Sequence, residues 1–302
     1  MDHQSWSIGD ITVTKLVEME ATVAAGGPES GLPDCWPEAG RQTPWLIPNC
    51  ADEQGHLHMS VHALLVQTPD MRLIVDTCVG NDKVRQTEAW HKLSTRFLDD
   101  MAAFGWTRDS VDGVLCTHLH VDHVGWNTVW EDGQWRPTFP NARYYMARKE
   151  FDHWASEMDG VDLTTGLGSA AIAMMDTAAV FLDSVKPVFD AGLVELVDLD
   201  AVIAPGVRLL PTTGHTPGHV SVILESGADR AVITGDMMHH PCQIARPEWA
   251  SAFDYDAKES ERTRQSFMDM FADTPTLIIG THFGGPTAGK LVRGETGYWL
   301  DA

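Results

Sequence analysis

The sequence lacks long apolar runs, internal repeats and low-complexity tracts, and each absence removes a class of protein. No stretch approaches the roughly 18 consecutive apolar residues that a membrane-spanning helix needs. The first residues also lack the basic segment followed by an apolar segment that marks a secretory signal peptide. We therefore expect a cytoplasmic protein that does not interact with a membrane.

Basic residues and paired cysteines are also scarce. The chain has 21 Lys and Arg against 43 Asp and Glu, so its formal net charge is −22 at pH 7. Because nucleic-acid binding depends on neutralising phosphates, this balance argues against a nucleic-acid partner. The five cysteines are odd in number and form no C-x-x-C pair, so the sequence predicts no disulfide framework.

What remains is a chain of ordinary globular composition, with 302 residues of which 43% are hydrophobic. Length alone allows one or two domains. No long linker interrupts the chain, and we expect a single domain over residues 1–302. A turn-rich stretch at residues 26–49 holds five prolines and is predicted to form a loop near the active site.

Short apolar segments alternate with helical patterns along the chain, and several of them are joined by tight turns such as Pro69-Asp70. Strands are expected at residues 11–19, 61–69, 71–79, 111–118, 193–199, 207–213, 220–226, 230–236 and 276–282, and a strand entering a helix at 142–151. Helices are expected at residues 81–104, 169–184 and 258–271. Tight turns exclude a purely parallel sheet, so we predict an α/β fold: an αββα sandwich of two mixed β-sheets flanked by helices.

One segment concentrates potential metal ligands. His118, His120, Asp122 and His123 follow directly after the apolar strand at 111–118. In extended backbone His118 and His120 project to one side, and the following turn lets Asp122 and His123 face a second point close by. Imidazole and carboxylate groups are the ligands that zinc and similar divalent metals accept at neutral pH.

Three more candidates, His215, Asp236 and His282, each stand at the end of another apolar strand. Strand ends are where a rigid scaffold presents functional groups, and a glycine beside each candidate permits close backbone approach. Together the chain offers five histidines and two aspartates. This is enough for two metal ions and too many for one four-coordinate structural site.

These motifs carry a resemblance to a known family. HLHVDH resembles the HxHxDH signature of the metallo-β-lactamase superfamily, and TGHTPGH, TGD and GTH are similar to its later metal motifs in the same order. The resemblance implies that His118, His120 and His215 hold one metal. It also implies that Asp122, His123 and His282 hold a second, that Asp236 bridges both, and that Asp76 buttresses the metal histidines.

Within this superfamily, the full ligand set is typical of two-metal hydrolases and not of the mono-iron dioxygenases. No cysteine stands beside His215 or Asp236, which disfavours penicillin hydrolysis. The segment with His239 three residues after Asp236 resembles the corresponding segment in the organophosphate-hydrolase and lactonase-like branch. The better-known quorum-quenching lactonases carry tyrosine there, so its absence argues against acyl-homoserine lactone specificity.

The resemblance implies a metal-bridging hydroxide as the nucleophile, and three residues with catalytic roles. Asp236 and Asp122 hold the metals, Asp236 also moves a proton to the leaving group, and His239 donates a hydrogen bond to the developing oxyanion. We expect two divalent ions per chain, with zinc first and Mn, Fe or Co as substitutes.

The predicted substrate is a small, fairly apolar lactone or carboxylic ester. A phosphotriester (organophosphate) is the alternative, and an iron-dependent oxidoreductase on the same fold is the alternative of another class. Trp36, Trp45, Trp126 and Trp249 are candidates for either an aromatic substrate pocket or core packing. The expectation of a homodimer rests only on the family resemblance.

Overall fold

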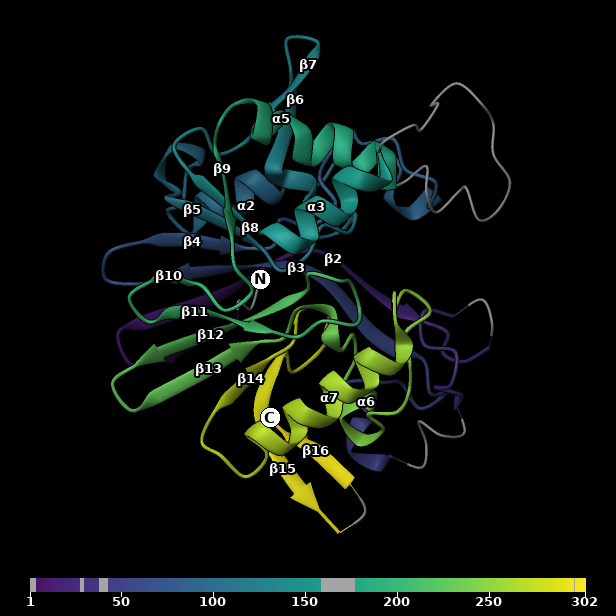
Figure 1. Ribbon diagram of the computed structural model, residues 1–302. Coiled ribbons are helices and arrows are strands. Elements are labelled where there is room, and N and C mark those ends of the chain that lie inside the picture. Colours follow the sequence, from purple (N-terminus) through teal and green to yellow (C-terminus); the bar gives the residue numbers. More distant parts are fainter. Residues whose placement is uncertain (1–3, 28–29, 38–42, 159–176, 296) are drawn as a thin grey trace. The chain divides into compact units, whose positions relative to one another are not determined.

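The computed structural model describes residues 4–27, 30–37, 43–158, 177–295 and 297–302 (Figure 1). The chain divides into two units and forms two seven-stranded sheets. The first unit comprises Met1–Trp6, Thr12–Glu18 and His62–Asp198, and the second comprises Ser7–Ile11, Met19–Val61 and Leu199–Ala302. The expectation of one domain over residues 1–302 stays a prediction.

The first sheet has the strand order β1-β2-β3-β4-β5-β8-β9. It consists of β1 (Ser5–Ile8), β2 (Ile11–Val23), β3 (Leu57–Gln67), β4 (Arg72–Val75), β5 (Gly113–Cys116), β8 (Arg143–Ala147) and β9 (Val194–Val197). It is mixed, because β3 and β4 pair antiparallel while β4, β5, β8 and β9 run parallel. All four residues of β5 are buried, as expected for a central parallel strand covered on both faces.

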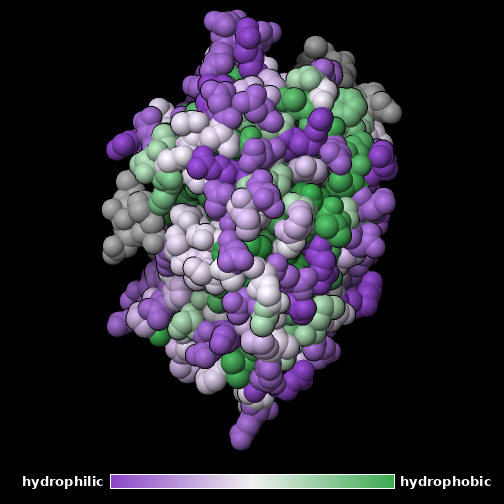
Figure 2. All heavy atoms as spheres, turned by 90° about the vertical axis from the view of Figure 1, so that its left-hand side faces the viewer, coloured by the Kyte–Doolittle hydropathy of each residue, from purple (hydrophilic) through white to green (hydrophobic). Residues whose placement is uncertain are grey.

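Helices cover one face of the first sheet (Figure 1). Among them are α2 (Phe97–Ala103), α3 (Arg148–Glu157) and α5 (Lys186–Asp190). The described part of the unit also contains η2 (Glu88–Trp90), η3 (Arg108–Ser110), η4 (Gly125–Asn127) and the π-helical η5 (Phe181–Val185). A separate hairpin of β6 (Thr128–Glu131) and β7 (Gln134–Pro137) projects from the unit in Figure 1. Figure 2 shows hydrophilic residues over most of the face that it draws, in keeping with the acidic composition.

The second sheet has the order β10-β11-β12-β13-β14-β15-β16 and is also mixed, because only β13 and β14 pair parallel. Its strands are β10 (Val202–Ala204), β11 (Val207–Pro211), β12 (Val220–Ser226), β13 (Asp229–Ile233), β14 (Leu277–Ile279), β15 (Ala288–Gly294) and β16 (Gly297–Asp301). The helices of this unit are η1 (Pro44–Leu46), η6 (Gly235–Met237), α6 (Cys242–Ala245) and α7 (Ala257–Phe271).

Helix α7 shows how the sequence specifies an element of the second unit. The Asp256 side chain caps its first turn by accepting hydrogen bonds from the backbone N–H groups of Lys258 and Glu259. Its buried residues recur at helical spacing, and Phe267, Met268 and Phe271 join a core cluster with Ile278 and Phe283. The predicted helix at 258–271 is therefore confirmed.

The two predicted mixed sheets with flanking helices are confirmed, but the helix predicted at residues 81–104 is wrong in extent. Only α2 and the short η2 form there. Asp82 and Lys92 adopt positive φ angles of 65° and 49°, which no α-helix accommodates. Asn81 instead binds the backbone of Thr95, so the segment folds back as a loop.

The helix predicted at residues 169–184 lies partly outside the described residues, and its described part continues into η5. None of the described helices is long and apolar enough to cross a membrane.

Candidate metal centre

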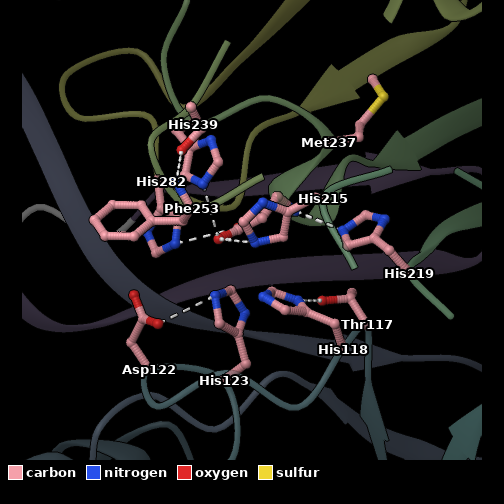
Figure 3. Close-up of polar contacts among 12 residues, drawn as sticks. Thr117, His118, Asp122, His123, His215, His219, Met237, His239, Phe253 and His282 are labelled. Carbon is pink, nitrogen blue, oxygen red and sulfur yellow. Dashed lines mark hydrogen bonds and ion pairs between the residues drawn. The ribbon is translucent and has the colours of Figure 1, made fainter. Parts of the chain in front are cut away.

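In the first unit, the predicted ligands His118, His120, Asp122 and His123 follow the end of β5. His118 and His123 are fully buried, and their ring centroids are 4.0 Å apart. The His120 ring is 4.6 Å from the His118 ring. Asp122 Oδ1 lies 3.5 Å from His123 Nε2 (Figure 3). The structure thus brings these four predicted residues together within their unit.

Asp76, at the end of β4, fixes the orientation of two of these histidines. It accepts hydrogen bonds from the backbone N–H of Thr117 and from the Thr117 hydroxyl, each at 2.8 Å. Its Oδ2 also accepts from His123 Nδ1 at 2.9 Å. Because the Thr117 hydroxyl has only one proton, and Asp76 takes it, His118 Nδ1 must donate to Thr117 Oγ1 at 3.1 Å.

Both histidines therefore carry their ring proton on Nδ1, which makes Nε2 the atom that would bind a metal.

A second carboxylate supports the same loop. Glu150 at the start of α3 is buried and accepts from the backbone N–H of Leu119 at 3.1 Å and from Trp154 Nε1 at 2.6 Å. The Trp154 ring in turn lies 5.6 Å from the His120 ring.

In the second unit, His215, Asp236 and His282 follow β11, β13 and β14, respectively. Two of their neighbouring glycines are needed for steric reasons. Gly235 has a φ of 56°, and a Cβ there would collide with the His219 ring. A Cβ at Gly214 would collide with the backbone of Ser260 on α7. The predicted close approach of the backbone at these glycines is confirmed.

The second-unit histidines are also oriented through Nδ1. His282 Nδ1 donates to the backbone carbonyl of Ser60 at 2.9 Å. His215 Nδ1 donates to Asp254 Oδ1 at 3.1 Å, and both side chains are fully buried. Asp254 Oδ2 accepts from the backbone N–H of Ser251 at 2.9 Å and lies 3.4 Å from buried Arg264.

Asp254 thus does for His215 what Asp76 does for His123. Burial acts to raise the pKa of Asp254, but the hydrogen bond from His215 and the charges of His239, His215 and Arg264 lower this pKa below its ordinary value. The group is therefore a carboxylate, which can accept the His215 proton. No local pattern in the sequence marked Asp254, because its partner lies 39 residues away in the chain.

The Asp236 carboxylate lies close to three histidines of the second unit. Its Oδ2 is 3.3 Å from His239 Nε2 and 3.7 Å from His215 Nε2, and its Oδ1 is 3.2 Å from His282 Nε2. The donor atoms of His215, Asp236 and His239 all lie within 4.8 Å of one another. The two oxygens therefore face different histidines, as a carboxylate that bridges two ions would.

The other histidines of this region differ in their partners. His219 Nε2 accepts from the backbone N–H of Asp236 at 2.8 Å, so its Nδ1 donates to the Thr212 carbonyl at 3.0 Å. Both of its ring nitrogens therefore serve the scaffold. His240 also supports the scaffold, because its Nδ1 accepts from the Cys242 N–H at 3.0 Å and its Nε2 donates to the Cys50 carbonyl at 2.8 Å.

His239 is the exception among them. Its side chain is only 8% exposed, yet among the described residues neither ring nitrogen has a hydrogen-bond partner. Its ring lies 4.8 Å from the His215 ring and 6.0 Å from the His282 ring. A buried polar ring without such partners is costly, so it is expected to meet a ligand or a substrate.

The donor chemistry fits divalent metals in both units. Each unit offers buried imidazoles whose Nδ1 is engaged by a carboxylate, hydroxyl or carbonyl oxygen, together with an aspartate beside their Nε2 atoms. This is the arrangement that orients metal-binding histidines in proteins.

Of the four tryptophans considered as pocket residues, Trp126 belongs to the core, because it is buried, stacks on Phe97 and donates to Glu18.

Comparison with known proteins agrees with the fold and the donor set. The model of the metallo-beta-lactamase superfamily matches residues 58–282, and the chain therefore belongs to this superfamily. The matched residues include every predicted metal ligand in both units.

Individual relatives are more distant. An N-acyl homoserine lactonase of Bacillus thuringiensis is 22% identical over 189 residues, which cover 59% of this chain and 63% of the relative. A probable metallo-hydrolase of Mycobacterium bovis is 26% identical over 189 residues, covering 59% of this chain and 57% of the relative. The chain thus spans less than two thirds of the length of these curated relatives.

Among solved structures, the hydrolase AbOPH of the beta lactamase superfamily has a TM-score of 0.78 at 24% identity, covering 99% of this chain and 97% of its own. The dizinc quorum-quenching lactonase AidC has a TM-score of 0.75 at 19% identity, with the same coverage. At these identities the likeness establishes the fold, and the predicted metallo-β-lactamase fold is confirmed.

Proposed function

We propose that the chain is a binuclear metal-dependent hydrolase that cleaves a small, fairly apolar lactone or carboxylic ester. In this proposal the two donor sets serve one centre: His118, His120 and His215 hold one ion, Asp122, His123 and His282 hold the other, and Asp236 binds both. The observation that carries the proposal is the Asp236 carboxylate, whose two oxygens face the Nε2 atoms of His215 and His282, the ligands assigned to different ions.

Two divalent ions bound there would polarise the substrate's carbonyl oxygen and lower the pKa of a bound water toward about 7. The chain's own residues do the rest. Asp76 and Asp254 hold the imidazoles of His123 and His215 in the tautomer that keeps Nε2 without a proton. Asp236 accepts the proton of the attacking water on a carboxylate oxygen and passes it to the leaving oxygen.

His239 is proposed to donate a hydrogen bond to the substrate oxygen that becomes negatively charged. Its buried ring has no hydrogen-bond partner among the residues that the structure describes, so it retains a donor for this purpose. Zinc is the proposed metal, since imidazole and carboxylate donors suit it, although Mn, Fe and Co are accepted by the same donors.

The first test combines metal analysis with a substrate screen. The purified protein, loaded with zinc and freed of excess metal, is expected to hold about two ions per chain and to hydrolyse lactones or aryl esters. A stoichiometry of one or less in active protein would overturn the binuclear site. Faster cleavage of phosphotriesters would reassign the substrate class, and oxygen uptake with bound iron would reassign the reaction.

The second test removes the bridging carboxylate. Asp236→Ala is expected to lower kcat at least about 100-fold and to reduce the bound metal, because both ions lose a ligand. Asp229→Ala is the matched control, since this exposed aspartate at the start of the same strand binds only the backbone N–H of Gly9 in the described contacts. Near-normal kcat in the Asp236 variant would exclude the assigned role.

A further inference from the structure

Phe253 is a large apolar side chain that is 61% exposed in the second unit. It lies in the segment between α6 and α7, next to Asp254, the carboxylate that orients His215. A single exposed phenylalanine needs no explanation on an ordinary surface. This one differs, because its backbone is held on both sides and its ring lies beside the proposed catalytic histidine.

Hydrogen bonds fix the segment around Phe253. Its own N–H donates to Ser251 Oγ at 3.2 Å, and the N–H of Ala252 donates to the Gly31 carbonyl at 2.9 Å. On the other side, the N–H of Tyr255 donates to the carbonyl of His215 at 2.9 Å. The segment is therefore attached to the described part of the proline-rich loop and to a predicted metal ligand.

The ring of Phe253 is covered on one side and exposed on the other. Its centroid is 6.3 Å from that of His239, with an angle of 47° between the ring planes (Figure 3). Gly31 backs the ring, because a Cβ on Gly31 would lie 3.0 Å from Phe253 Cε2. The absent side chain at position 31 thus leaves the room that the ring needs, and the rest of the ring faces solvent.

We propose that Phe253 is a specificity-determining residue, which packs against the apolar acyl chain or aromatic ring that the substrate carries next to its scissile carbonyl. The inference rests on the proposed function, because it assumes that the carbonyl oxygen meets His239. A group attached to that carbonyl then lies within reach of the phenyl ring, and covering exposed apolar surface favours binding.

The test compares substrates that differ only in this apolar group. In a series of p-nitrophenyl esters from acetate to octanoate, Phe253→Ala is expected to lose roughly 10- to 100-fold in kcat/KM for octanoate, the range for one apolar contact surface. For acetate the loss is expected to stay below about 3-fold. Zinc content should not change, since Phe253 offers no ligand atom.

Two further variants make the test specific. Tyr255→Ala is the matched control, because Tyr255 is an aromatic residue in the same segment and is 67% exposed; it should not change the chain-length preference. Gly31→Ala keeps the phenyl ring but crowds it, so it is expected to give a smaller change in the same direction as Phe253→Ala. Equal losses for acetate and octanoate in Phe253→Ala would overturn the proposal.

A binding measurement separates this inference from the proposed function. Calorimetric titration of the zinc-loaded protein with octanoate should give a Kd about 10-fold weaker in Phe253→Ala, and the same Kd for acetate in both proteins. If no ester or lactone is hydrolysed but octanoate binding still depends on Phe253, the proposed function fails and the apolar subsite stands. If octanoate binds both proteins equally, the subsite fails whatever the enzyme hydrolyses.

Discussion

The contacts of Nε2, and not the Nδ1 proton, distinguish the histidines of the two donor sets from those of the scaffold. His118, His123, His215 and His282 each donate this proton to an oxygen of the protein, which leaves Nε2 as the metal-binding atom. His219 and His240 use both nitrogens for the scaffold. His240 thus has a partner at both ring nitrogens, whereas the adjacent His239 has a hydrogen-bond partner at neither among the described residues.

A prediction follows for this adjacent pair. His239→Ala is expected to keep both metals and to lose roughly 10- to 1000-fold in kcat/KM, the range up to the loss of one oxyanion donor. His240→Ala is expected to have a milder effect on kcat/KM. It should instead lower the free energy of unfolding by about 2 to 4 kcal/mol, because the Cys50 carbonyl and the Cys242 N–H lose their partner.

Kinetics, metal analysis and urea denaturation of the two variants decide the matter. Loss of metal from the His239 variant would make His239 a ligand, which its 3.3 Å distance to Asp236 Oδ2 would allow. Small and equal kinetic losses in the two variants would leave His239 as mere lining of the site.

Among the elements, the loop that replaces the predicted helix at 81–104 contains a buried polar network. Arg85 forms two hydrogen bonds with Asp183 at 2.7 and 2.9 Å. Lys83 donates to Thr128 Oγ1 at 2.5 Å, lies 3.6 Å from Asp183 Oδ1, and sits 3.6 Å from the centroid of the Trp135 ring. The network ties this loop to η5 and to the β6–β7 hairpin.

Burial lowers the pKa of Lys83 to about 7, and Arg85 acts in the same direction, while Asp183 and Asp82 oppose the shift. Between this pKa and the ordinary lysine value of 10.5, the unfolded chain binds more protons at Lys83 than the folded chain does. Stability therefore rises with pH through this window, and the cost of burying the charged group is fully present below it.

Lys83→Met is expected to remove this dependence. Between about pH 7 and 10.5, the free energy of unfolding of the natural protein should rise relative to that of the variant by on the order of a few kcal/mol. Urea denaturation at both ends of the window measures the difference, and Lys258→Met, at an exposed position in α7, is the control. Parallel pH profiles for the natural protein and the Lys83 variant would show that Lys83 does not titrate in this range.

At the scale of the whole molecule, the family model spans donors from both units, so metal should stabilise the chain as a whole. Binding to the folded state alone adds about 4 kcal/mol when the free metal is 1,000 times its Kd. Zinc-loaded protein is therefore expected to melt several degrees above chelator-treated protein. Asp236→Ala should lose most of this increase in Tm and Asp229→Ala should keep it.

Calorimetry with and without added zinc checks this expectation. An unchanged Tm in the natural protein would mean that the donors do not bind zinc in the folded chain. An equal increase in the Asp236 variant would mean that zinc binds elsewhere, for example at exposed groups of this acidic protein.

The sequence alone predicted the candidate donor residues and the ends of the strands that present them. Apolar runs such as VDGVLC and LIIG, each followed by histidine, are local signals, because a buried strand needs several consecutive apolar residues and the polar side chain that follows stands at its end. The same signals predicted two mixed sheets. Asp76 was predicted from the family resemblance, and it too follows the end of a strand.

Only the tertiary structure decided which residues act on those donors. Asp254 meets His215 across 39 residues, and the Ser60 carbonyl meets His282 across 222. Gly31 makes room for Phe253 from the other end of the chain. Lys83 and Lys92 lie in a stretch whose apolar residues have helical spacing, but no continuous helix forms there. Lys83 instead pairs with the distant Asp183, and Lys92 adopts a positive φ angle. The spacing of apolar residues depends only on neighbours in the chain, whereas these contacts depend on how distant segments of the chain meet in the fold.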